Sequence, residues 1–361
     1  FSEARLRGES AAAVILNPKN GDILAMASAP TFDPNKFVRG ISSKDYQGLL
    51  DDPYRPLPDK SSQGIYPPGS TFKMVTALAA LEDGLISLDD TYTCGGYVEV
   101  SDRRFHCWRR GGHGKVDLVR SLRESCDVYY YELCQEVGIE RIAAMARRLG
   151  LGVAYDLPLL SVAEGRVPTR EWMRRSRGAD CVICDKLNVR FVLGFVLSSP
   201  LLLAVMTARF GSGRRVTPRL VRAIDGVEQP VSGGESLGID PRNLAAIRQG
   251  MYDVTNHERG TAISSRVVAE GLRIAGKTGT SQVRSITAEE RVEGVTSNED
   301  LPWDRRDHAL FVGYAPHENP EVAVAVVVEH GGGGSTVAAP IARDLLLAAI
   351  YDDVPPLEAY P

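Results

Sequence analysis

Apolar residues follow two different spacings along this chain, and the spacings separate strand-like ends from a helical middle. Residues 11–16 and 23–27 are apolar runs joined through Asn20-Gly21, which predicts a β-hairpin. From residue 72 to 84 the apolar positions recur at helical spacing, and after residue 254 the period changes to two. Further helices are predicted over 118–138, 140–149, 196–209, 243–254 and 338–351, and further strands over 273–280, 309–314 and 322–329.

This order of elements predicts an α/β (α+β) fold. An antiparallel sheet built from both chain ends would be flanked by helices and would carry an inserted helical subdomain. We expect one domain, with its sheet part in residues 1–28 and 265–351 and its mainly helical part in residues 65–255. Two stretches show neither period. Residues 29–64 are predicted to be a long surface segment, and residues 91–114 an irregular excursion.

Composition narrows the class of protein. The 361 residues are 43% hydrophobic and 24% charged, as in a globular protein with room for a large core. The net charge of −4 gives no reason to expect nucleic-acid binding. No apolar run reaches 18 residues, and the chain starts at Phe1, so we expect a fragment without a membrane span or signal peptide. With eight lysines against 34 arginines, each lysine is informative.

Ser70 and Lys73 are the first candidates for chemistry. They follow a Pro-Pro-Gly turn at the start of a predicted helix, where residues three apart share one face. A neutral amine there can accept the hydroxyl proton, and the N–H groups of the helix N-terminus can bind an oxyanion. By itself the pair also fits an N-capping serine beside a solvated lysine.

Two further motifs strengthen the interpretation of Ser70 and Lys73 as catalytic residues. Ser125-Cys126-Asp127 lies 55 residues after Ser70, and Lys277-Thr278-Gly279-Thr280 ends a predicted strand. Separately they read as a capped helix and a strand-end turn. Together the motifs supply a nucleophile, a base, a second hydroxyl to pass a proton to a leaving group, and a cation with hydroxyls to hold a carboxylate.

The three motifs, in this order, resemble those of penicillin-binding transpeptidases and serine β-lactamases: Ser-x-x-Lys, Ser-Asp-Asn and Lys-Thr-Gly. The middle motif matches only in its leading serine and overall form. Three stretches, 17–28, 66–73 and 308–316, are similar to class B penicillin-binding proteins of the elongation type, penicillin-binding protein 2. The resemblance covers residues 11–351.

The resemblance implies a peptidoglycan D,D-transpeptidase that forms an acyl-enzyme. Ser70 would attack the carbonyl between the two terminal D-alanines of a stem peptide, with Lys73 as proton acceptor and Ser125 as relay to the leaving D-alanine. Asp127 would tune Lys73 by charge or cap its helix. The backbone N–H groups of Ser70 and Thr280 would form the oxyanion hole. The donor carboxylate would be held by Lys277, Thr278 and Thr280.

Gly279 would let the substrate approach the strand backbone closely, as an added strand does. A β-lactam would mimic the donor and leave the serine acylated. Residues 190–194 depart from the family, because bulky side chains stand where the family has a Gly-x-Gly-Gln-Gly run. That departure leaves the shape of one pocket wall undetermined.

The resemblance also implies a setting and partners. The chain would work in cell elongation at the periplasmic face of the bacterial inner membrane, with its membrane anchor and N-terminal non-catalytic domain missing here. Partners would be stem peptides, β-lactams, a membrane glycosyltransferase of the SEDS family (RodA) and other elongation-complex proteins, with no catalytic cofactor. One alternative is a serine β-lactamase, although no water-activating base stands out near Ser70. Another is a non-catalytic β-lactam sensor or scaffold.

Four residues in and just beyond the irregular excursion have the composition of a structural zinc site. They are Cys94, Cys107, His113 and Cys126, and they fall within 33 residues. A metal there would fix the excursion to the back of the middle motif. The alternatives are a Cys94–Cys107 disulfide or packed thiols, and His106 is an alternative fourth ligand.

The remaining cysteines carry weaker signals. Cys134 lies on a predicted helix and is expected in the core. Cys181 and Cys184 could bind a metal or form a strained bridge, and the sequence favours neither.

Overall fold

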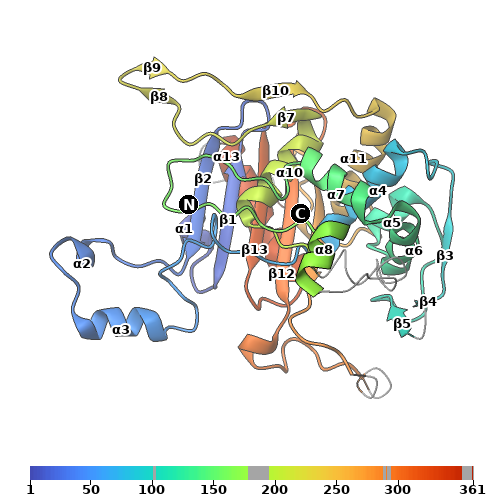
Figure 1. The fold of residues 1–361 in the computed structure, drawn as a ribbon, viewed down its shortest axis with the longest axis horizontal. Helices are drawn as coiled ribbons and strands as arrows, with labels where there is room; N and C mark the ends of the chain where they lie inside the picture. Colours follow the sequence, from blue (N-terminus) through green and yellow to red (C-terminus); the bar gives the residue numbers. More distant parts are fainter. Residues whose placement is uncertain (101–102, 178–194, 288–289, 291–293, 352–359, 361) are drawn as a thin grey trace.

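The computed structural model describes residues 1–100, 103–177, 195–287, 290, 294–351 and 360. Its centre is a five-stranded sheet with the order β11-β12-β13-β1-β2, and every pairing is antiparallel (Figure 1). The strands are β1 (Ala11–Leu16), β2 (Ile23–Ala29), β11 (Ala275–Ser281), β12 (His308–Ala315) and β13 (Val322–Val328). Both chain ends therefore build one sheet, as predicted.

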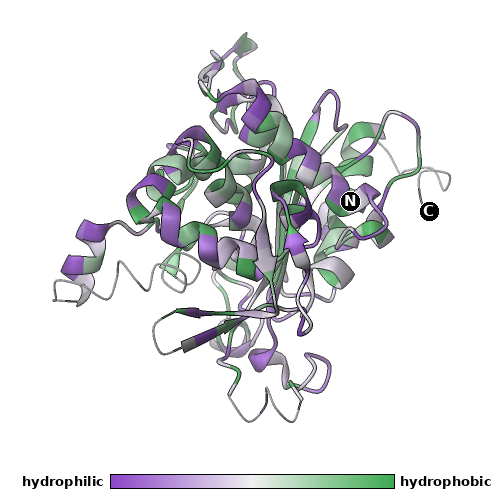
Figure 2. Ribbon diagram, turned by 90° about the vertical axis from the view of Figure 1, so that its right-hand side faces the viewer, coloured by the Kyte–Doolittle hydropathy of each residue, from purple (hydrophilic) through white to green (hydrophobic). Residues whose placement is uncertain are grey.

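Both faces of this sheet are covered. Every residue of β13 is buried, with Val324 and Val326 on one face and Ala325 and Val327 on the other. Helix α13 (Ala339–Tyr351) packs on the first face, and α10 (Pro200–Ser212) packs on the second. Figure 2 shows helices on the two sides of the sheet. A strand covered on both faces is apolar throughout, which explains the continuous valine-rich sequence.

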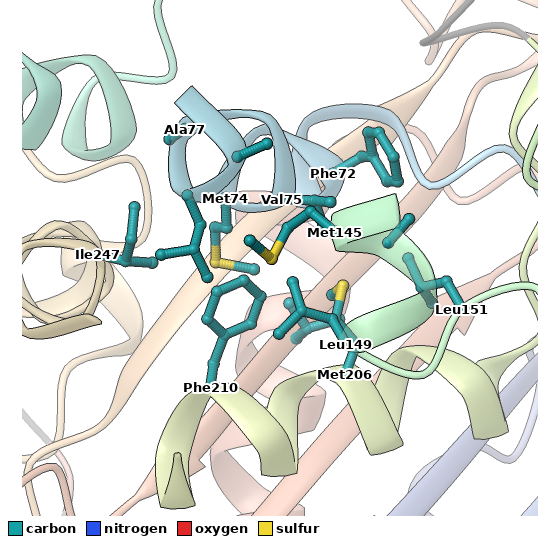
Figure 3. Packing of buried hydrophobic residues seen from close by; sticks show 14 of the residues in the cluster. Phe72, Met74, Val75, Ala77, Met145, Leu149, Leu151, Met206, Phe210 and Ile247 are labelled. Carbon is teal, nitrogen blue, oxygen red and sulfur yellow. The ribbon is translucent and has the colours of Figure 1, made fainter. Parts of the chain in front are cut away.

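The serine helix α4 (Lys73–Glu82) is anchored in the larger of the two cores. Met74 and Val75 pack with Met145 of α7 (Ile139–Arg148) and with Met206 and Phe210 of α10 (Figure 3). Each fully buried side chain of this kind contributes roughly 1.5–3 kcal/mol relative to exposure. The N-terminus of α4 is therefore held firmly against the sheet.

The helix predicted over 118–138 is wrong in one respect, because the structure breaks it in two. Helix α5 (Leu118–Arg123) and helix α6 (Asp127–Val137) are separated by a short turn. Ser125 in this turn has φ +53°, a left-handed conformation that few residues adopt. Helical periodicity continues across the turn, so no local pattern in residues 118–138 predicts the break.

The two stretches without periodicity contain regular elements. Residues 29–64 include α2 (Asn35–Val38) and α3 (Ser43–Asp51), which project from the sheet and have no buried residue (Figure 1). The prediction of an irregular excursion at 91–114 is wrong. It forms two short antiparallel pairs, β3 with β6 and β4 with β5. These are Tyr92–Cys94 with Gly114–Val116, and Tyr97–Val100 with Arg103–His106.

The remaining elements connect these parts. The helices are α1 (Ser2–Arg5), α8 (Arg170–Arg177), α11 (Pro241–Asn256), η1 (Gly69–Phe72), η2 (Ile263–Ser265), η3 (Trp303–Arg305) and η4 (Gly334–Ala338). The strands are β7 (Arg214–Val216), β8 (Ala223–Ile224), β9 (Val227–Glu228) and β10 (Gly233–Ser236). Among the described helices, none combines the length and the apolar character needed to span a bilayer.

Candidate active site

Ser70 lies on η1, a 3-10 turn that leads directly into α4. Gly69 precedes it with φ +54°, and a Cβ on Gly69 would lie 2.8 Å from the carbonyl oxygen of Thr280. Glycine therefore lets the turn lie against strand β11. Within the described part of the chain, the Ser70 hydroxyl has no hydrogen-bond partner, and the residue is half-buried. The oxygen is available to a substrate.

Lys73 is buried one helical turn from Ser70 and is held by the middle motif. Its Nζ lies 2.7 Å from Asp127 Oδ1, 2.9 Å from the Ser125 carbonyl oxygen and 3.2 Å from Ser125 Oγ. An ammonium has three N–H groups, so these three acceptors match its full donor capacity. The amine is held in one position beside the serine turn.

Lys277 reaches the same hydroxyl from the sheet. Its Nζ donates to Ser125 Oγ at 2.9 Å and to the Thr278 carbonyl at 3.1 Å. Burial lowers the pKa of Lys277 well below its ordinary value, and the neighbouring Lys73 cation lowers it further. Ser125 Oγ therefore lies between two amines, and one of them, Lys73, pairs with the carboxylate of Asp127. The group is electrically balanced when one amine is protonated and the other is neutral.

Strand β11 forms one edge of the sheet. Thr278 is buried, and its Oγ1 lies 2.9 Å from Oγ1 of Thr261, whereas Thr280 is exposed. In the described residues no strand pairs with the outer side of β11, so its backbone is open to an added strand.

Gly279 has a structural reason that the sequence did not indicate, in addition to the substrate approach expected of it. A Cβ on Gly279 would lie 3.0 Å from Thr71 Cγ2 and 3.1 Å from the Pro68 carbonyl oxygen. This glycine therefore also allows the close approach of the serine turn, which packs on the same face as Lys277. Gly279 and Gly69 act together, because each removes a side chain from the contact between η1 and β11.

The four cysteine and histidine residues predicted as metal ligands lie together and are buried. The potential ligand atoms of Cys94, Cys107, His113 and Cys126 all lie within 4.8 Å of one another. His113 Nδ1 is 3.6 Å from the sulfur of Cys94 and 3.5 Å from that of Cys107. The alternative disulfide is wrong, because both thiols are free. His106 lies outside this group, with its ring near that of Tyr97.

The other cysteines have separate positions. Cys134 is fully buried in the larger core, as expected. Cys181 and Cys184 lie outside the described residues, and so does the atypical stretch 190–194.

Sequence reasoning missed a connection between the cysteine cluster and the catalytic motif. The backbone N–H of Trp108, the residue after Cys107, donates to Asp127 Oδ2 at 2.9 Å. The Trp108 indole N–H donates to the Glu124 carbonyl at 3.1 Å. Asp127 is thereby held from both sides, with Lys73 on one oxygen and Trp108 on the other. The sequence signal for this connection was that Trp108 directly follows Cys107, one of the predicted metal ligands.

Comparison with known proteins decides the family. The family described as penicillin binding protein transpeptidase domain matches residues 11–347. The chain belongs to the penicillin-binding protein transpeptidase family. Among curated relatives of this family, the peptidoglycan D,D-transpeptidase MrdA of Haemophilus influenzae is 35% identical over 98% of this chain and 55% of its own length. MrdA of Escherichia coli K12 is 35% identical over 93% of this chain and 54% of its own length. This transpeptidase chain spans about half the length of those relatives.

Solved structures of the family agree with the architecture. Pseudomonas aeruginosa PBP2 in complex with WCK 5153 is 35% identical, with a TM-score of 0.84 over 100% of this chain and 79% of that chain. PBP2 of Helicobacter pylori in complex with MreC is 31% identical, with a TM-score of 0.83 over 97% of this chain and 62% of that chain. The predicted penicillin-binding fold and the resemblance to penicillin-binding protein 2 are confirmed.

Proposed function

We propose that this chain is the transpeptidase part of a peptidoglycan D,D-transpeptidase that cross-links stem peptides during cell elongation. One observation carries the proposal. Three motifs that are far apart in the sequence meet at Ser125 Oγ, with Lys73 Nζ at 3.2 Å and Lys277 Nζ at 2.9 Å, beside the serine turn. The family membership and the MrdA relatives support the same reaction.

In the first half-reaction, the donor peptide lies along the open edge of β11. Thr278, Thr280 and Lys277 hold its terminal carboxylate, which places the preceding carbonyl at Ser70. The N–H groups of Ser70 and Thr280 bind the oxyanion as Ser70 Oγ attacks. The close packing of Gly69 on Thr280 supports this arrangement, because it keeps the two N–H groups near each other.

Proton transfer uses the amine pair. Lys73 in its neutral form accepts the Ser70 proton, and Ser125 passes a proton to the nitrogen of the departing D-alanine. A donor carboxylate close to Lys277 favours the ammonium form of that lysine. A proton moving through Ser125 then leaves Lys73 neutral. Substrate binding and base activation are therefore coupled through one hydroxyl.

Benzylpenicillin tests the proposal directly. Incubation of the chain with the drug, followed by intact-mass measurement, should give a lasting adduct that Ser70→Ala abolishes. Rapid return to the unmodified mass would instead indicate a β-lactamase, and no adduct at all would contradict the proposal. Transfer of an acyl group from a thioester donor to a D-amino acid separates a transpeptidase from a β-lactam sensor.

We also propose that Cys94, Cys107, His113 and Cys126 hold a structural Zn²⁺. The donor set supports this, because three sulfur atoms and an imidazole nitrogen within 4.8 Å match a closed tetrahedral site. The ion would supply no catalytic step. It would fix the short strand pairs around the cluster, and with them the Trp108 backbone that holds Asp127.

Metal analysis of protein purified without chelator tests the zinc proposal. About one equivalent of zinc is expected, with loss of metal and a lower melting temperature in Cys107→Ser. Cys134→Ser is the control, because Cys134 is buried outside the cluster. A zinc content far below one equivalent would contradict the proposal.

Relatives suggest the cellular setting. One solved PBP2 forms a complex with MreC, and another similar chain, 30% identical, comes from a peptidoglycan synthase complex. We propose that this chain likewise works at the periplasmic face of the inner membrane with elongation-complex partners, including a SEDS-family glycosyltransferase. Co-purification of the full-length protein with these partners would test this.

A further inference from the structure

A cavity of about 670 Å³ lies beside the catalytic group and belongs to none of its motifs. One wall is the loop around Trp108, and the other is the segment 258–261 that follows α11. Each wall is one hydrogen bond from the catalytic residues. Trp108 donates to Asp127, and Thr261 bonds Thr278. The cavity therefore lies one hydrogen bond from Asp127 on one side and one hydrogen bond from Thr278 on the other.

Some charged side chains of the cavity lining have close ion-pair partners, and others have none. Arg120 and Glu124 pair with each other at 2.9 Å. The Arg259 guanidinium has no ion pair or hydrogen bond with the described residues, and Arg109 has only a 3.9 Å approach to Glu124. Glu258 is the remaining acidic residue of the lining. Arg259 and Arg109 are thus the cations available to a ligand.

A buried polar atom also lies in this wall. His113 is one of the lining residues, and its Nε2 is buried without a hydrogen-bond partner in the described residues. Because Nδ1 faces the sulfurs of Cys94 and Cys107, Nε2 is the nitrogen left to donate. A free guanidinium and an unused N–H donor both suit a carboxylate.

The position of the cavity indicates which substrate it serves. In the proposed reaction Thr278 holds the terminal carboxylate of the donor, so the region reached through Thr261 lies beyond the donor's C-terminal end. D-Alanine leaves from that end. The acceptor amine forms its bond at the same carbonyl carbon that the D-alanine nitrogen has left, so it approaches from the same side.

We propose that this cavity binds the acceptor peptide and that Arg259 binds a carboxylate of it. The inference rests on the proposed transpeptidase function. The acceptor amine attacks the Ser70 ester, a C–N bond forms and the C–O bond to Ser70 breaks. A neutral lysine amine takes the amine proton, and Ser70 oxygen regains a proton. Arg259 holds the acceptor during this step and takes no part in the proton transfer.

Two free acceptors that differ by one carboxylate provide the test. L-Lysine is meso-diaminopimelate without the carboxylate of its D-centre, the centre whose amine and carboxylate are free in a stem peptide. With a D-alanyl thioester as donor, the ratio of transfer to hydrolysis is measured by liquid chromatography and mass spectrometry. We expect the parent chain to prefer diaminopimelate, and Arg259→Gln to lower transfer to it about 10-fold, as for a lost charge-assisted hydrogen bond. Transfer to the side-chain amine of L-lysine should not change.

Two further variants control for charge: Arg259→Lys keeps the positive charge, and Arg242→Gln removes one positive charge elsewhere. Arg259→Lys should keep part of the preference, and Arg242→Gln, an exposed arginine at the other end of α11, should keep all of it. Penicillin acylation and melting temperature should be unchanged in Arg259→Gln, which shows that the donor site is intact.

Equal transfer to both acceptors by the parent would overturn the inference, as would an equal effect of Arg259→Gln on both. In either case the parent still turns over the thioester, so the proposed function stands. Absence of thioester turnover in the parent would instead contradict the proposed function, and the inference with it.

Discussion

The contact between the serine turn and β11 gives the sharpest prediction for function. Gly69→Ala adds a Cβ that would lie 2.8 Å from the Thr280 carbonyl oxygen, whereas ordinary contact begins at 3.4 Å. The turn must therefore move by about 0.6 Å, the difference between these two distances. The left-handed φ of +54° adds about 1–2 kcal/mol of backbone strain. A displacement of this size beside the nucleophile should slow acylation about 10- to 100-fold.

Gly84→Ala is the matched control for Gly69→Ala. Gly84 lies just past the other end of α4 with φ +65°, and a Cβ there meets nothing within 4 Å. Both variants should lose the stability that a left-handed alanine costs, but only Gly69→Ala should acylate slowly. Acylation rates with a fluorescent penicillin and urea unfolding of both variants make the comparison. Equal acylation rates in the two variants would refute the link between this contact and Ser70.

The remaining predictions concern the amine pair and the response to acid. Ser125→Ala removes the hydroxyl between Lys73 and Lys277 and should lower the acylation rate by about 10²–10⁴-fold. Circular dichroism should show that the fold is retained. An unchanged acylation rate would exclude the proposed relay. Burial, and then the neighbouring His330, lower the pKa of His308 to about 4 from an ordinary 6.5. The unfolded state therefore binds more protons between these values, so the free energy of unfolding should fall by up to about 3 kcal/mol as the pH drops from 6.5 to 4. Urea unfolding across this range should show a smaller fall in His308→Gln, and equal falls would contradict the assignment.

Local patterns in the sequence were sufficient for much of this protein. The β1–β2 hairpin follows from its two apolar runs and its Asn20-Gly21 turn, and α4 follows from helical spacing. Spacing along a helix also places Lys73 near Ser70. The cysteine and histidine residues could be grouped because they are close in the chain. Each of these features depends on interactions over a few residues, which the sequence encodes directly.

Only the tertiary structure decided how the motifs meet. Lys277 is 152 residues from Ser125, and their hydrogen bond exists because the sheet edge lies against the turn between α5 and α6. The left-handed Ser125 in that turn carries no sequence signature, since helical periodicity continues through it. The role of Gly279 likewise depends on which segment packs against it. These features rest on contacts between distant segments, and such contacts are set by the packing of the whole domain rather than by the period of any one element.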